Sequence, residues 1–267
     1  MISKLDRRAL RKRLHITGCP RSGTTLLMEA ICACIEHQGR CEHEQSIFDN
    51  RDLPAGLYIS KQPTDIRRIR HIFYGDENLY VIYIYRDPRA VICSQHHQQP
   101  GLYFCNYRIW RACEQAAGHY EGQARFLRVR YESLVSDPDK VQREIIEQFS
   151  FLKVLHEFSQ FHHWAQPSGL SATAMSGLRP PDSKRLAPWR NHLPRVAQQL
   201  KLYPEMATEL NRLGYEKDTQ WQSELQNVAP KNYPCRYSDR RQRLKEWETS
   251  VRVFLKSKRY MQGLHRG

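Results

Sequence analysis

The chain has 267 residues, of which 40% are hydrophobic and 26% are charged, with 13 glycines and 14 prolines. This balance excludes a collagen-like, coiled-coil or disordered chain and is typical of one globular domain with a substantial core. The longest purely apolar run, Leu79 to Tyr85, is far shorter than the about 20 residues of a membrane-spanning helix. The basic N-terminus has no apolar stretch that resembles a secretory signal. We therefore expect no transmembrane segment and a cytoplasmic location.

The formal net charge is +14, from 42 basic and 28 acidic residues. Most of the excess lies at the two ends: residues 1–13 carry six basic groups and one acidic group, and residues 238–267 carry nine basic and three acidic groups. A nucleic-acid-binding domain carries its basic stripe across the folded surface, so this distribution disfavours specific binding to a duplex. We expect only electrostatic contacts of the basic ends with polyanions.

The eight cysteines form no Cys-x-x-Cys pair. We therefore expect mostly reduced, buried thiols rather than a disulfide framework. Cys41 lies near His37 and His43, but no second Cys/His pair at ligand spacing accompanies them, so no metal site is expected.

The predicted elements alternate between strands and helices along the chain. The strands are expected at residues 14–18, 57–61, 79–85 and 126–131. The helices are expected at residues 24–35, 65–73, 89–97, 104–123, 136–149, 194–213 and 238–260. Residues 166–188 show no period and are predicted to form a long loop. Such alternation implies right-handed crossovers and an α/β fold, a central parallel sheet flanked by helices in three layers.

A glycine-rich segment, Gly18-Cys-Pro-Arg-Ser-Gly-Thr-Thr, follows the first strand and opens a helix. Backbone N–H groups at such a helix start form an anion site. The spacing is that of GxxxxGK[ST], but Thr24 replaces the lysine that reaches the β- and γ-phosphates of a triphosphate. Arg21 offers a fork of donors instead. The segment therefore predicts an anion site without triphosphate chemistry, unless it is only a turn that packs a strand on a helix.

A second candidate anion site follows the strand 79–85. Arg86 lies at the end of this strand, and Ser94 is predicted two turns into the next helix, so both can face one anion. Ligands of an open parallel sheet collect beyond the carboxyl ends of its strands, where the glycine-rich segment also emerges. Alone, Arg86 and Asp87 indicate a salt-bridged strand end. Together with the first segment they predict two anion sites about one nucleotide apart.

These segments resemble those of the sulfotransferase family. PRSGTT and RDPRAVICS are similar to its elements that bind the 5′-phosphosulfate and the 3′-phosphate of the donor. That donor is 3′-phosphoadenosine 5′-phosphosulfate (PAPS), and adenosine 3′,5′-bisphosphate (PAP) is the product. Further segments resemble tyrosylprotein sulfotransferases and related bacterial enzymes, namely RCEHEQSIF, ISKQP, VRYESLV, LAPWRNHLP and LNRLGYEKD.

The resemblance implies a P-loop-like catalytic domain over residues 14–218. It leaves a basic N-terminal segment, residues 1–13, and a basic C-terminal extension, residues 219–267, that is predicted to be helical. The resemblance also assigns roles to single residues. The 5′-phosphosulfate ligands are Arg21, Ser22, Gly23, Thr24 and Thr25. The 3′-phosphate ligands are Arg86 and Ser94, and further nucleotide contacts are Tyr131 and Thr173.

The resemblance also implies catalytic roles for Glu44, Lys61 and Arg21. Glu44 matches the general base of the family, and Lys61 matches the basic residue that steadies the transferring sulfuryl group. A second family lysine corresponds to Pro188, and Lys184 or Arg185 is expected to compensate for it.

The choice of the base stays open because this chain has Glu42-His-Glu where its relatives have Gly-Glu-Glu. Glu42 and His43 are therefore alternatives to Glu44. In an extended segment Glu42 and Glu44 share one side, and His43 points to the other.

The resulting prediction is a metal-free, PAPS-dependent enzyme. It transfers a sulfuryl group in line to an acceptor hydroxyl of a carbohydrate, a phenol or tyrosine, or a small molecule. Four aromatic residues after the second anion segment either line an acceptor cleft or belong to the core, namely Tyr103, Phe104, Tyr107 and Trp110. The alternatives are a P-loop kinase or triphosphatase and a non-enzymatic module that binds polyanions.

Overall fold

The computed structural model describes residues 11–49, 53–96, 99–181, 186, 188–237 and 251–263. Its central sheet has five parallel strands in the order β2-β3-β1-β4-β7. In that order the strands are β2 (Gly39–Arg40), β3 (Gly56–Lys61), β1 (Arg11–Gly18), β4 (Leu79–Tyr85) and β7 (Phe126–Arg130). The predicted α/β fold with a central parallel sheet is therefore confirmed. The short edge strand β2 was not predicted from the sequence.

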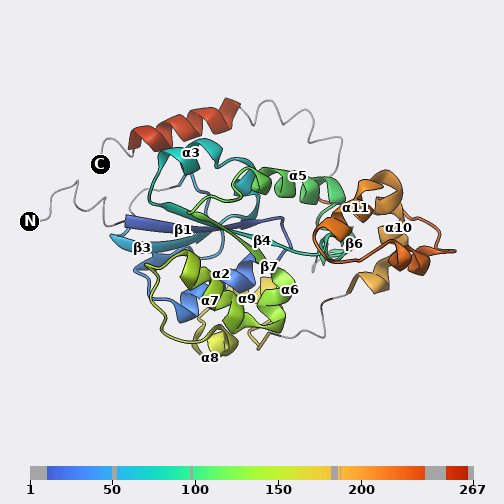
Figure 1. The fold of residues 1–267 in the computed structure, drawn as a ribbon, viewed down its shortest axis with the longest axis horizontal. Helices are drawn as coiled ribbons and strands as arrows, with labels where there is room; N and C mark the ends of the chain where they lie inside the picture. Colours follow the sequence, from blue (N-terminus) through green and yellow to red (C-terminus); the bar gives the residue numbers. More distant parts are fainter. Residues whose placement is uncertain are drawn as a thin grey trace, which may run out of the picture.

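Helices cover both faces of the sheet and complete three layers (Figure 1). One face carries α3 (Arg70–Gly75), α5 (Tyr107–Gly118) and a helix over residues 251–263. The other face carries α2 (Thr24–Cys34), α6 (Tyr131–Ser136), α7 (Pro138–Gln148), α8 (Phe161–Trp164) and α9 (Gly169–Met175). Beyond the strand ends lie α10 (Leu193–Leu202) and α11 (Glu205–Arg212).

Short elements connect these layers. They are the 3-10 helices η1 (Pro63–Arg67), η2 (Phe158–Gln160), η4 (Pro188–His192) and η5 (Gln220–Leu225), the helix α4 (Pro88–Ile92), and the antiparallel hairpin β5 (Gln95–His96) and β6 (Gln99–Tyr103).

The apolar core lies in two parts, one on each face of the sheet. Side chains of a strand alternate between the faces, and β4 shows this directly. Val81 and Tyr83 pack with α3 and α5, whereas Ile82 and Ile84 pack with α2 and α7. All four side chains are fully buried. A strand covered on both faces explains the nearly continuous apolar run in the sequence of β4.

The register of the sheet brings the candidate site segments to one edge. Gly18 at the end of β1 pairs with Ile84 of β4, and Ile16 pairs with Lys61 at the end of β3. The end of β7, Arg130, pairs with Tyr85. The segments that follow these strands therefore emerge side by side at the carboxyl edge of the sheet.

The helix expected at residues 89–97 is shorter than predicted, because α4 ends at Ile92. The placement of Ser94 two turns into a helix is therefore wrong. The buried Arg195 of α10 explains this end: its guanidinium donates to the Ile92 and Cys105 carbonyls at 3.4 and 3.1 Å. The chain after Ser94 forms the hairpin β5–β6 instead.

The segment 166–188 is also more regular than predicted. Residues 169–175 form α9, and the Ser168 hydroxyl caps the helix by accepting a hydrogen bond from the Ser171 N–H at 3.2 Å. The sequence offered a signal, a serine in front of a run with three alanine and threonine residues. The high content of glycine, proline and serine around it concealed this short helix.

Two boundaries drawn from the sequence fall within packed structure. Arg11–Arg13, which had been assigned to the basic N-terminal segment, open β1, and Arg13 is buried. Trp221, in the predicted C-terminal extension, is buried against Trp189. Of the helix predicted at 238–260, residues 251–260 are helical, and residues 238–250 lie outside the described residues. The eight cysteines carry free thiols, and seven of them are buried. In the part of the chain that the structure describes, no helix is both long and apolar enough to cross a membrane.

Candidate active site

The loop between β1 and α2 is shaped by its own hydrogen bonds and glycines. The N–H and hydroxyl groups of Ser22 both donate to the Cys19 carbonyl, at 3.0 and 2.6 Å. A Cβ at Gly18 would lie 2.6 Å from the Ile84 carbonyl oxygen. Gly23 has a φ of +100°, and a Cβ there would lie 2.3 Å from the ring of Tyr131. Glycine is therefore required at both positions, and the ring of Tyr131 covers the loop.

The same loop collects hydrogen-bond donors and positive charge. Among the described residues, no side chain caps the first turn of α2, whose N–H groups have no acceptor within the helix and lie at the positive end of its dipole. Arg21 donates from Nε to the Ser94 hydroxyl at 2.7 Å. Its burial and the neighbouring Arg86 lower the pKa of Arg21. A phosphate or sulfate group fits this environment. It would accept hydrogen bonds from these N–H groups and relieve the repulsion between Arg21 and Arg86.

Arg86 lies where β4 ends, and its guanidinium is held by two neighbours. Its Nη1 atom donates to the Arg21 carbonyl at 3.2 Å, and its guanidinium carbon lies 4.2 Å from the centroid of the Tyr131 ring. Its Nε atom is buried and has no hydrogen-bond partner among the described residues. An unpartnered buried donor beside a cluster of cations indicates that an anion completes this site.

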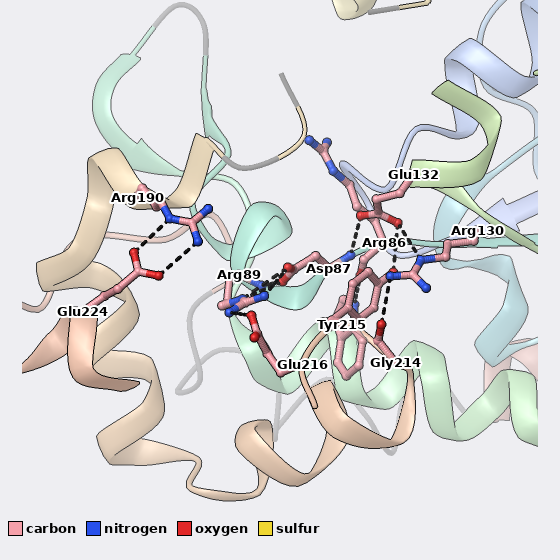
Figure 2. Close-up of polar contacts among 11 residues, drawn as sticks. Arg86, Asp87, Arg89, Arg130, Glu132, Arg190, Gly214, Tyr215, Glu216 and Glu224 are labelled. Carbon is pink, nitrogen blue, oxygen red and sulfur yellow. Dashed lines mark hydrogen bonds and ion pairs between the residues drawn. The ribbon is translucent and has the colours of Figure 1, made fainter. Parts of the chain in front are cut away.

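The residues around Arg86 form a rigid frame, which Figure 2 shows. The Glu132 carboxylate accepts hydrogen bonds from the Asp87 N–H and the Tyr215 hydroxyl, both at 3.0 Å. Arg130 lies over the ring of Tyr215 at 4.1 Å. This network ties the end of β4 to the end of β7 and so fixes where Arg86 leaves the sheet.

The second arginine of the RDPR segment has a structural role. Arg89 is 3% exposed and forms ion pairs with Asp87 and Glu216 (Figure 2). Its guanidinium also contacts the rings of Trp189 and Trp221, at 4.3 and 4.8 Å from their centroids. Arg89 therefore anchors the LAPWRNHLP segment to the strand edge and does not face a ligand.

Lys61 connects the glycine-rich loop with the candidate base. Its Nζ atom lies 2.9 Å from the Thr25 hydroxyl and 3.4 Å from a carboxylate oxygen of Glu44. The lysine side chain is buried, because β3 ends beneath the loop. Burial lowers the pKa of Lys61, and the carboxylate of Glu44 opposes this shift.

The segment 41–45 is not arranged as an extended strand would be. His43 and Glu44 both line the cavity described below, whereas Glu42 is exposed and is not part of its wall. The expectation that His43 points away from Glu44 is therefore wrong. His43 is held by the buried Ser171 of α9, whose hydroxyl lies 3.0 Å from Nδ1. Burial and the charge of Lys61 lower the pKa of His43, which leaves the ring neutral at pH 7.

One cavity of about 720 Å³ joins these groups. Its wall contains predicted residues from both anion sites and from the catalytic set, namely Arg21, Gly23, Thr24, Thr25, Glu44, Arg86, Tyr131 and Thr173. Thr173 reaches the cavity from α9. Ser22 and Ser94 are not part of the wall, and Lys61 lies behind Thr25 and Glu44. Lys184 and Arg185 lie outside the described residues.

Residues 11–165 match the sulfotransferase domain family. The chain belongs to the sulfotransferase family. This match contains the glycine-rich loop, Lys61, Arg86 and Tyr131. It ends before α9 and the last helices, so the family match says nothing of the residues that these later segments contribute to the cavity.

Solved sulfotransferase structures share the fold of this sulfotransferase at low sequence identity. A sulfotransferase domain from the curacin biosynthetic pathway is 18% identical with a TM-score of 0.53, and the match covers 78% of this chain and 99% of that domain. The mouse sulfotransferase SULT7A1, solved in complex with PAP, is 16% identical with a TM-score of 0.50, over 82% of this chain and 89% of that one. A comparison with curated protein sequences gives no match.

The structure adds cavity residues to this sulfotransferase that the sequence did not indicate. Phe104, which was expected either in an acceptor cleft or in the core, lines the cavity, whereas Tyr103, Tyr107 and Trp110 are buried in the core. Arg179 and Arg236 also line the cavity. Neither lies in a motif, so only the fold reveals their position. Among the described residues no group of three or more metal-ligating side chains is arranged around a common point.

Proposed function

We propose that this sulfotransferase transfers the sulfuryl group of PAPS to the hydroxyl of an acceptor, with Glu44 as the general base. The observation that carries this proposal is the position of Lys61. Its ammonium group bridges Thr25, at the start of α2, and Glu44, and both of these residues line the cavity. Lys61 thereby contacts both the expected site of the leaving group, at Thr25, and the proposed proton acceptor, Glu44.

The residues of the cavity fit the donor in two respects. The free N–H groups at the start of α2 suit its 5′-phosphosulfate, and the buried, unpartnered Nε of Arg86 suits its 3′-phosphate. The mouse relative SULT7A1 was solved with PAP, the product of this donor. We assign Arg21, Gly23, Thr24 and Thr25 to the 5′ group, with Ser22 shaping the loop, and Arg86 and Ser94 to the 3′ group.

When bound, PAPS supplies an electrophilic sulfuryl group on a phosphate leaving group. Sulfuryl transfer resembles phosphoryl transfer in its loose, in-line transition state, so positioning and charge neutralisation supply most of the catalysis. Lys61 and Arg21 neutralise the negative charge that develops on the phosphate oxygen as its bond to sulfur breaks. The acceptor oxygen forms the new bond to sulfur, and Glu44 takes the proton that this oxygen loses.

The exposure of Glu44 supports its role as the base. Its side chain lines the cavity and is 41% exposed, whereas that of Lys61 is 1% exposed. An acceptor can reach the carboxylate, and the buried ammonium keeps it in place. His43 is neutral at pH 7 and lines the same wall, so it is the second candidate for this role.

Binding of PAP decides between this proposal and triphosphate chemistry. In calorimetry with a chelator present, we expect PAP to bind far more tightly than ATP. Tighter binding of ATP with magnesium would instead support a kinase or triphosphatase. Mass spectrometry of the protein mixed with PAPS and a panel of carbohydrates, phenols and tyrosine peptides would then identify the acceptor class by a mass increase of one sulfuryl group.

A further inference from the structure

The segment before residue 237 is fixed along the hairpin strand β6, beside the cavity. The Tyr103 N–H donates to the Pro234 carbonyl, and the Arg236 N–H donates to the Tyr103 carbonyl, both at 3.0 Å. On the far side of Arg236, the Asn106 amide donates to the Tyr237 carbonyl at 2.8 Å. The backbone of Arg236 is therefore held on both sides. This segment lies outside the family match, which ends at residue 165.

The side chain of Arg236 reaches the cavity wall next to Arg21. The guanidinium carbon of Arg236 lies 5.0 Å from the centroid of the Phe104 ring, and that of Arg21 lies 5.6 Å from the same centroid. Both distances are within the range of cation–π contacts. No carboxylate of the described residues forms an ion pair with Arg236, so its charge is available to an anionic ligand.

The same ring is tied to the proposed 3′-phosphate site. The Phe104 N–H donates to the Ser94 carbonyl at 2.9 Å, and the Ser94 hydroxyl accepts from Arg21 Nε at 2.7 Å. Arg236 thus contacts the ring of Phe104, whose backbone is hydrogen-bonded to Ser94. Arg86 closes the group through its hydrogen bond to the Arg21 carbonyl. Arg21, Arg86 and Arg236 therefore line one cavity, with Arg21 bonded to Ser94 and Arg236 on the ring of Phe104. A dianionic phosphate matches such a group of cations better than a single charge does.

We propose that Arg236 is an additional ligand of the 3′-phosphate of the donor nucleotide, supplied by a segment outside the family domain. This inference rests on the proposed function, because it takes PAPS as the donor. Arg236 thereby adds a cation to the second anion site from outside the matched residues 11–165. Since the side chain of Arg236 is exposed, its contribution is that of a screened surface charge and falls as the salt concentration rises.

Two nucleotides that differ only in the 3′-phosphate test this assignment. We expect Arg236→Gln to weaken PAP binding about 10-fold, the lower end for a hydrogen bond to a charged group, and to leave adenosine 5′-phosphate binding unchanged. Arg236→Lys should recover part of the loss because it keeps the charge. Calorimetry at low salt and at about 0.5 M salt should show the difference shrinking.

A matched control is Lys231→Gln, which removes one positive charge from the same segment. Lys231 contacts the ring of Tyr233 and is not part of the cavity wall, so PAP binding should not change. Thermal unfolding of each variant shows whether it is folded.

The outcomes separate the inference from the proposed function. If the wild-type protein does not bind PAP, the proposed function fails, and the inference fails with it. If the wild type binds PAP and Arg236→Gln binds it equally well, only the inference is wrong. An equal loss for PAP and for adenosine 5′-phosphate would place Arg236 on the 5′ group and would also overturn the assignment.

Discussion

The ammonium nitrogen of Lys61 lies 3.4 Å from a carboxylate oxygen of Glu44, and the two side chains differ sharply in exposure, at 1% and 41%. The cation is buried at the end of β3, and its second contact is the Thr25 hydroxyl. The carboxylate lies at the accessible end of the pair. This arrangement holds a fixed positive charge between the expected leaving group and an accessible proton acceptor.

Replacement of Lys61 by methionine should remove the charge that neutralises the leaving group while keeping the length of the side chain. We expect Lys61→Met to lower the rate of sulfuryl transfer about 10²- to 10³-fold, as the loss of one oxyanion-hole donor does in acyl transfer. Single-turnover assays with bound donor measure this rate directly. Lys153→Met is the matched control, since Lys153 is exposed and pairs with Glu36 away from the cavity wall. An equal rate in both variants would exclude a catalytic role for Lys61.

Replacement of Glu44 by glutamine tests the base itself. Glu44→Gln keeps the shape of the side chain but cannot accept a proton, so turnover should fall about 10²- to 10⁴-fold while PAP affinity is preserved. Glu42→Gln should have no effect, because Glu42 is not part of the cavity wall. If His43→Asn alone causes the large loss, the base is His43, and the assignment of Glu44 must be abandoned.

The strands and most helices of this fold follow from local sequence patterns. The apolar run of β4 is a local signal for a buried strand. Asn106 and Asp137 are local signals for helix starts, and α5 and α7 begin directly after them. The end of α4 was not predictable in this way. Arg195 donates a hydrogen bond to the Ile92 carbonyl, and this arginine lies in α10, more than a hundred residues later in the chain.

The candidate site shows the same division. The glycine-rich loop and Arg86 were predicted because the backbone geometry of an anion site requires glycine, and because arginine ends a central strand. His43 is held at the cavity by Ser171 of α9, a helix that was not predicted from the sequence. Arg236 joins the wall only through its pairing with Tyr103, a contact between segments far apart in the sequence.

The two arginines of the RDPR segment should separate binding from stability. Arg86→Ala removes a charged ligand, so PAP affinity should fall by about 1.5–3 kcal/mol with little change in stability. Arg89→Ala instead leaves Asp87 and Glu216 without their cation, and loss of one partner of a buried pair costs about 3–5 kcal/mol of folding free energy. Calorimetry and urea unfolding of both variants measure the two quantities. A stability loss as large in Arg86→Ala as in Arg89→Ala would contradict this division.

The last prediction concerns the buried cluster beneath the loop that follows Glu44. His15 is fully buried, with Nδ1 2.8 Å from the Ser60 hydroxyl and Nε2 3.5 Å from an Asp65 carboxylate oxygen. Asp65 accepts a hydrogen bond from the Ile47 N–H at 2.6 Å, and Arg13 donates to the Ile47 carbonyl at 2.9 Å. This cluster holds the chain three residues after Glu44. Burial lowers the pKa of His15 below its usual 6.5, and the charge of Arg13 adds to this, although Asp65 opposes it.

Because the folded pKa of His15 is the lower one, the unfolded chain binds more protons between that value and pH 6.5. The stability that neutral His15 provides is therefore complete above pH 6.5 and is lost as the pH falls toward the folded pKa. We expect the free energy of unfolding to fall between pH 7.5 and about pH 5.5, and to fall less in His15→Asn, which keeps a group that can bond to Ser60. Urea unfolding at both pH values measures the two slopes. The two proteins share all other titratable groups, so the difference between the slopes isolates His15. Equal slopes would show that His15 does not cause the acid sensitivity.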